Sequence, residues 1–255
     1  MTAMGILAPG VFHVRGDPAA RSAMIDGRKV DIDGWSSVDL SRARLWSGEP
    51  PRGLRVPDWA IAQTHTALLA ARRPGGLADL LDPCLEPASP ILAAAAQSLS
   101  GVTTLGALVG LGPGLTPAGD DFLTGMLLAE TVLRRGRLGE AERVSIAEAL
   151  PGTSAPGRTL LTLALSGSFP AYLLTFVRAL SLARAAEQVG AAVEAACRHG
   201  ETSGSDALAG FLQATRIICH SAGARTSNGR SPRPSRTGST TGSPRPEGRR
   251  ESRTP

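Results

Sequence analysis

The sequence GLGPGLTPAGDDFLTG, residues 110–125, decides the organisation of this chain. Four glycines and two prolines in its first ten residues cannot continue a helix, so this part is expected to form a rigid loop whose backbone can come close to a ligand. The segment after Gly119 is expected to run as a helix to Arg135, because Phe122, Met126, Ala129 and Leu133 follow a helical spacing with one buried face.

A second segment repeats this pattern. The spacing Gly119-x-Asp121-x-Leu123-x-Gly125 returns as Gly204-x-Asp206-x-Leu208-x-Gly210, and a threonine, Thr116 or Thr202, precedes each copy. Each copy predicts a polar turn that enters a helix, where unpaired N–H groups and the helix dipole favour an anion. Each could also be only a capped and tightly packed helix start, since Asp is a favoured N-cap residue. The pairing, with His199 before the second copy, favours a shared site.

Helical signals extend from residue 58 to about residue 220. Asp58 after Pro57 and the Ser89-Pro90 pair are typical helix starts. Together with the apolar patterns they predict helices over 58–73, 90–100, 120–135, 139–150, 157–166, 170–181, 184–198 and 205–219.

The ends of the chain differ from this helical part. Short apolar runs punctuated by Asp26-Gly27 and Asp33-Gly34 predict hairpins in residues 1–57. Residues 221–255 consist mainly of Ser, Thr, Arg, Pro and Gly and are expected to be disordered. The predicted fold class is therefore α+β: a small β-rich N-terminal part (1–57), a helical domain (58–220) and a disordered basic tail (221–255).

Charge and cysteine content exclude several classes of function. The net charge is +5, but the tail has eight arginines against Glu247 and Glu251, or +6, which leaves −1 for the other 220 residues. A nearly neutral folded part does not predict nucleic-acid binding. Three scattered cysteines suit a reducing compartment, and no apolar run reaches the length of a membrane span. The chain is expected to be soluble and cytoplasmic, without a membrane partner.

Familiar catalytic motifs do not fit the glycine-rich loop. It lacks the lysine of a Walker A motif and the glycine spacing of a dinucleotide-binding turn. The chain has no H-E-x-x-H sequence, and Ser203 does not lie in a G-x-S-x-G elbow. No cofactor and no metal ligand set are predicted.

The loop resembles the signature G-L-G-P-G-L-T-P-S-G-D-D-F-L-x-G of the AllH-type family, which includes a subunit of oxamate carbamoyltransferase. Residues 199–210 resemble that family's G-H-T-S-G-x-D-x-L-x-G segment, and residues 160–169 its L-x-x-A-x-x-G stretch. Ala118 replaces the usual Ser, and His199-Gly200-Glu201 reorders the usual Gly-His. The resemblance covers roughly residues 100–220.

This resemblance implies carbamoyl transfer between oxamate and carbamoyl phosphate, in allantoin breakdown, together with other carbamoyltransferase subunits. Since the leaving group is already good, the protein must mainly position small anions and stabilise developing charge. His199 is the candidate proton shuttle or oxyanion donor, Asp121 and Asp206 are expected to position the –NH₂ group or to brace the loops, and Asp120 is the candidate cap. The expected substrate-binding residues are Gly112, Gly114, Thr116, Gly119, Asp120, Thr202, Ser203 and Gly204. The Ser-Thr-Arg-Thr motif of aspartate-type carbamoyltransferases is absent from the predicted folded region.

Two other classes remain open from the sequence. The chain could be a non-catalytic ligand-binding or assembly subunit beside a catalytic partner. It could also be a divalent-metal-dependent hydrolase, in which Asp120, Asp121 and Asp206 would hold the cation through carboxylate oxygens.

Overall fold

The computed structural model describes residues 48–51, 54–82, 89–133 and 138–215 with their side chains. It describes only backbone elements for five short strands within residues 3–39 and for residues 216–227. Residues 228–255, most of the expected disordered tail, lie outside the described residues.

Eight α-helices and three short 3₁₀ segments make up the described helical part. The α-helices are α1 (Asp58–Ala71), α2 (Pro90–Leu99), α3 (Ala118–Leu133), α4 (Glu140–Ala149), α5 (Ala155–Leu165), α6 (Ala171–Leu182), α7 (Ala186–Cys197) and α8 (Ser203–Ser227). The 3₁₀ segments are η1 (Leu77–Leu81), η2 (Leu105–Leu108) and η3 (Leu150–Gly152). All eight predicted helices are confirmed, with ends that differ by at most two residues except for α8, which runs to Ser227, eight residues beyond the predicted end at 219. The 3₁₀ segments were not predicted.

The predicted α+β class is wrong. In the part described with its side chains, 71% of residues are helical and there is no strand or sheet, so the fold is mainly helical rather than one with a β-rich N-terminal layer. The five strands are β1 (Ala3–Ala8), β2 (Gly10–Arg15), β3 (Ala23–Asp26), β4 (Lys29–Ile32) and β5 (Val38–Asp39). They pair only among themselves, β1 with β2 and β3–β4–β5 in order, all antiparallel. Hairpin signals are local, and two or three short strands are too few to form a core layer.

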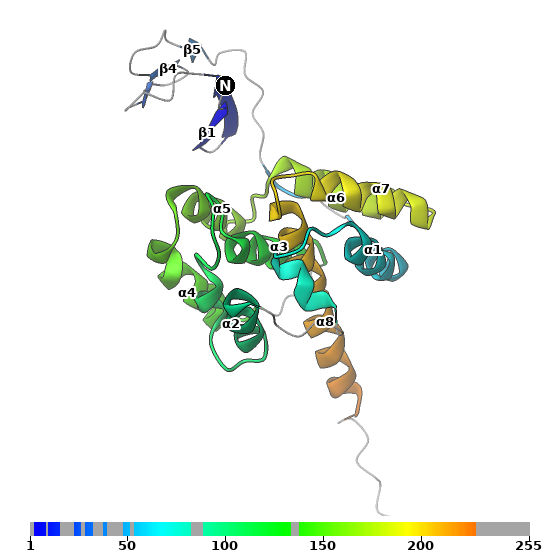
Figure 1. Ribbon diagram of the computed structural model, residues 1–255. Coiled ribbons are helices and arrows are strands. Elements are labelled where there is room, and N and C mark those ends of the chain that lie inside the picture. The colour runs from blue at the N-terminus through cyan, green and yellow to red at the C-terminus, as the bar shows by residue number, and fades with distance from the viewer. Residues whose placement is uncertain are drawn as a thin grey trace, which may run out of the picture.

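The core is organised around α3 and α8. Figure 1 shows these two helices at the centre, with α1, α6 and α7 on one side and α2, α4 and α5 on the other. Helix α3 is buried over most of its length, not only along the predicted stripe. Phe122 of α3 and Phe211 of α8 are almost fully buried, and Phe176 of α6 packs edge-on against Phe211 with ring centroids 5.6 Å apart.

Two glycines allow α3 and α8 to touch through their backbones. A Cβ atom on Gly125 would collide with the Ala207 carbonyl oxygen, and one on Gly210 would collide with the Phe122 carbonyl oxygen. Both contacts lie within two turns of the helix starts. This approach therefore fixes the starts of the two helices relative to each other.

Helix starts follow their local sequence only in part. Ser89 caps α2, since its Oγ accepts a hydrogen bond from the Leu92 amide at 3.2 Å, as Ser89-Pro90 predicts. Helix α1 instead begins at Asp58, and its N-cap is Pro57, without a side-chain cap. Among the described residues, no helix has the length and apolarity to cross a membrane.

Replacing Gly125 with Ala is expected to destabilise the fold by about 1–3 kcal/mol or more, because the methyl group must separate two packed helix backbones. Denaturant unfolding of the purified chain measures this change. Gly190→Ala is the matched control: it lies inside α7 with no neighbour within 4 Å of its Cβ position. Removing glycine from an open helical position should stabilise by about 0.5–1 kcal/mol. Equal effects of the two substitutions would contradict the packing argument.

Candidate functional site

The two repeated segments meet at the starts of α3 and α8. The Thr116 hydroxyl, just before α3, lies 3.4 Å from the Ser203 hydroxyl at the first residue of α8. Asp121 and Asp206 occupy the first turns of their helices and are 3% and 0% exposed. The sequence prediction that these two distant segments converge is therefore matched by their geometry.

Asp121 is a buried carboxyl group with an incomplete set of partners. Burial raises its pKa from 3.8 to about 7, although hydrogen bonds from the Ser203 and Thr116 hydroxyls favour its ionised form. The charges of Asp206 and Asp120 raise the pKa further. Within the described part of the chain, its Oδ2 atom has no hydrogen-bond partner. Such an acceptor is costly to bury unless a ligand or water supplies a donor.

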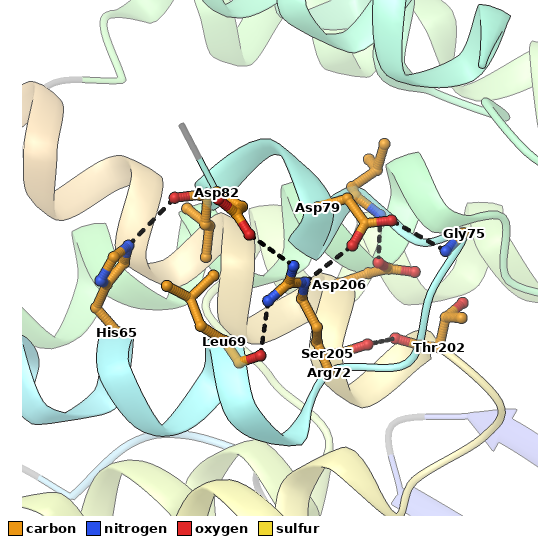
Figure 2. Close-up of polar contacts among 11 residues, drawn as sticks. His65, Leu69, Arg72, Gly75, Asp79, Asp82, Thr202, Ser205 and Asp206 are labelled. Carbon is orange, nitrogen blue, oxygen red and sulfur yellow. Dashed lines mark hydrogen bonds and ion pairs between the residues drawn. The ribbon is translucent and has the colours of Figure 1, made fainter. Parts of the chain in front are cut away.

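Asp206 has the same character and also braces a turn. Its Oδ1 accepts a hydrogen bond from the Leu77 amide at 2.6 Å, which holds the start of η1 against α8 (Figure 2). Burial raises its pKa to about 6, against the effect of hydrogen bonds from Thr202 and the Leu77 and Ala78 amides. Its Oδ2 atom also lacks a partner among the described residues. Oδ1 of Asp206 thus braces the turn before η1, a contact that the sequence did not predict, and Oδ2 is the atom without a partner in the described part of the chain.

A neighbouring ion-pair network fixes the η1 turn that contacts Asp206. Arg72, which follows α1, binds Asp79 and Asp82 at 2.9 Å each and donates to the Leu69 carbonyl at 2.6 Å (Figure 2). Asp79 also accepts the Gly75 amide at 3.0 Å. The network positions Gly76, where a Cβ atom would collide with Oδ1 of Asp206. The sequence offered no motif for this support.

Asp120, the candidate cap and substrate-binding residue, is directed to the other side of α3. Its Oδ1 accepts the Gly110 amide at 2.8 Å, and its Oδ2 accepts the Thr153 hydroxyl at 2.5 Å. Burial raises its pKa, and these two hydrogen bonds oppose that shift. Asp120 therefore ties the loop before α3 to the residues before α5.

Tyr172 lies within electrostatic range of Asp121 and Asp206, and His199 stacks on it. Their rings are stacked, with centroids 4.0 Å apart and planes inclined by 15°. Burial lowers the pKa of His199, which favours the neutral imidazole. Burial and the charges of Asp121 and Asp206 raise the pKa of Tyr172 well above 10.0, so its hydroxyl stays protonated. Sequence reasoning missed Tyr172; the only available signal was that it is the one tyrosine of the chain.

The backbone of the junctions is less open to an anion than the sequence suggests. The Gly119 amide donates to the Leu111 carbonyl at 2.9 Å, and the Gly204 amide donates to the His199 carbonyl at 3.0 Å. These N–H groups are therefore already used within the fold. Gly112 and Gly114 lie further out, both with φ of +105°, a conformation that favours glycine. The buried groups that lack partners at the junction are acceptors, which call for a donor rather than an anion.

A metal centre built on the three aspartates gains no geometric support. Among the described residues, no group of three His, Cys, Asp or Glu side chains is arranged to hold a metal ion. Asp120 binds Gly110 and Thr153, whereas Asp206 binds Leu77. The three carboxylates thus serve different partners.

The comparison with protein families confirms the resemblance. Residues 108–215 match the family described as oxamate carbamoyltransferase subunit AllH, and this match supports the resemblance of both aspartate segments to that family. The matched region spans α3 to α8 and includes both aspartate segments, Tyr172 and His199. No solved structure gives a significant match.

Replacing Asp121 or Asp206 with Asn is expected to stabilise the protein at pH 8. The folded-state pKa of each group is raised, so the unfolded chain ionises first as the pH increases from about 4 to about 7, and the folded state loses stability in that window. The Asn side chains do not ionise, so the variants avoid this loss. Their free energy of unfolding at pH 8 should exceed that of wild type by about 1–4 kcal/mol, and the difference should disappear near pH 4. Melting temperatures from pH 4 to pH 8 measure it.

Asp79→Asn is a control for which the melting temperature is expected to change in the opposite direction. Asp79 is paired with Arg72 and the Gly75 amide, so its neutral variant should lower the melting temperature at pH 8. Equal destabilisation by all three substitutions would show that Asp121 and Asp206 are satisfied carboxylates.

Proposed function

We propose that this chain is a subunit of an oxamate-type carbamoyltransferase in which Asp121 and Asp206 bind the –NH₂ end of a small amide substrate. The family match supports the coarser part, an oxamate carbamoyltransferase subunit. The observation that carries the finer part is the pair of buried Oδ2 atoms that lack hydrogen donors within the described residues. Oxamate and the carbamoyl group each carry an –NH₂ group, which supplies such donors.

The hydroxyls and rings around the carboxylates suit the rest of such a substrate. Thr116, Thr202 and Ser203 place hydroxyl groups at the junction, where they donate to Asp121 and Asp206 and their oxygens can accept a hydrogen bond from a bound –NH₂ group. A protonated Tyr172 hydroxyl is the donor for an oxygen of the substrate, and a neutral His199 can accept or return a proton. Fixed donors of this kind stabilise charge that develops during carbamoyl transfer.

The outer loop has a separate part in the proposal. Gly114 presents an exposed backbone that can approach the anionic end of a substrate, and Gly112, packed against Ala118, holds the turn that carries it. Leu115 between Gly114 and Thr116 is a large apolar side chain that is 75% exposed. This exposure favours the second candidate function, an assembly role in which the loop contacts another carbamoyltransferase subunit. The proposed setting is the cytoplasm, and no cofactor is included.

Asp121→Asn and Asp206→Asn are expected to lower kcat/KM of the complex assembled with its partner subunits by about 10-fold to 100-fold. The reason is that a charge-assisted hydrogen bond to substrate is replaced by a neutral one or by a repulsive N–H contact. Steady-state carbamoyl transfer and oxamate titration of the assembled complex measure the effect. Glu187→Gln removes a carboxylate from the exposed first turn of α7 and is the matched control.

The same variants separate catalysis from assembly. A complex that assembles normally and is at least as thermally stable as wild type, but has lost activity, supports the proposal. Full activity of both Asn variants would overturn it and would show that water satisfies the two oxygens. Loss of assembly on Leu115→Ser with intact oxamate binding would support the second candidate.

A further inference from the structure

A cleft of about 490 Å³ lies between the C-terminal halves of α1 and α7. This volume is in the usual range for small-molecule sites, roughly 300–1,000 Å³. Its walls include Ala67 and Ala70 of α1 and Gly190 of α7, whose small side chains leave the space open. None of the residues predicted from the sequence as site residues lines it.

Two arginines line this cleft from opposite elements. Arg73 follows α1, and Arg198 follows α7. Within the described residues, neither guanidinium forms an ion pair or hydrogen bond, whereas the adjacent Arg72 binds two aspartates and a carbonyl. Both arginines lie beyond helix C-termini, where a positive charge interacts favourably with the helix dipole. Among the described residues, neither donates to a carbonyl there, and both residues are exposed, so their guanidinium donors are accessible to a ligand from solvent.

The other polar groups of the cleft are Glu194 and Cys197. Burial raises the pKa of the Cys197 thiol to about 11, so the thiol stays protonated and adds no charge to the cleft. Arg73, Arg198 and Glu194 give the lining a formal net charge of +1. Guanidinium groups bind phosphate oxygens in pairs of parallel hydrogen bonds, which makes two unpaired arginines suited to an oxyanion.

The cleft borders the carboxylate site without being part of it. Cys197 lines the cleft, and a Cβ atom on Gly204 of α8 would lie 3.0 Å from its Cα. Arg198 lines the cleft, and the next residue, His199, stacks on Tyr172. Residues 197–199 thus separate a region of positive charge from a region of negative charge.

We infer that the α1–α7 cleft is a second binding site, which holds the phosphate group of a small phosphorylated molecule between Arg73 and Arg198. The volume exceeds what a lone phosphate needs, so the body of the molecule lies along the alanine-rich wall. This site is independent of the proposed amide binding by Asp121 and Asp206.

Calorimetric titration of the full chain with inorganic phosphate, carbamoyl phosphate and adenosine monophosphate tests the inference. We expect saturable binding at millimolar or lower concentration. Arg73→Gln and Arg198→Gln should each weaken it about tenfold or more, since each removes a charge-assisted pair of hydrogen bonds. Arg178→Gln, on the exposed face of α6, removes the same charge elsewhere and should leave the affinity unchanged within about twofold.

Glu194→Gln adds a variant with the opposite expected sign. Removing its negative charge should tighten phosphate binding. The substitution changes a cleft residue just as the arginine variants do, so a general disturbance of the cleft would instead weaken binding. Absence of saturable binding with all three probes, or equal weakening by the α6 control, would overturn the inference.

The order of affinities distinguishes the source of the phosphate. Tighter binding of carbamoyl phosphate than of inorganic phosphate, weakened by Arg73→Gln, supports a substrate site in the cleft, and tighter binding of the nucleotide supports a nucleotide site. Asp121→Asn should leave the binding of inorganic phosphate intact, because inorganic phosphate has no –NH₂ group for that carboxylate to bind. The failure of the amide-binding proposal is therefore distinguishable from failure of this one.

Discussion

The backbone contact between α3 and α8 is the constraint on which the rest of the structure depends. Gly125 and Gly210 allow the carbonyl oxygens of Ala207 and Phe122 to occupy positions that a side chain would need. Two helices that touch in this way have little freedom to slide or rotate, because backbone atoms cannot change rotamer as side chains do. Their first turns are therefore held together, and with them Asp121 and Asp206, which are separated by 85 positions in the chain (206 − 121).

The chemical character of the junction follows from this packing. Helix starts in isolation offer N–H groups and attract anions. Here the amides of Gly119 and Gly204 donate to Leu111 and His199, so the fold itself uses those donors. What remains unsatisfied within the described part are carboxylate oxygens, whose desolvation raises the pKa of both groups. A buried acceptor favours a ligand that donates hydrogen bonds, and this reverses the polarity expected from the helix dipoles alone.

Residues 197–199 separate the positive charges of the α1–α7 cleft from the two buried carboxylates. Arg73 and Arg198 reach the α1–α7 cleft from the ends of two helices, while Arg72, one residue away, is used to hold η1 against α8. Adjacent arginines thus have different environments, one structural and one open. The unsatisfied acceptors and the two guanidinium groups thus lie in separate parts of the fold.

The sequence by itself determined the helices, the glycine-rich loop and the resemblance to the family. Periodic apolar residues, Ser89-Pro90 and the repeated Gly-x-Asp-x-Leu-x-Gly spacing are local patterns, and local patterns fix local structure and motif identity. Only the tertiary structure decided the class of fold and the different hydrogen-bond partners of Asp120 and Asp121. It also placed Tyr172 against His199, and Arg72 in the ion-pair network that holds η1. A hairpin signal says nothing about whether strands form a core layer, and two neighbouring aspartates look alike until burial and partners distinguish them. The physical reason is that pKa, burial and unpartnered atoms arise from contacts between distant segments, which no short stretch of sequence contains.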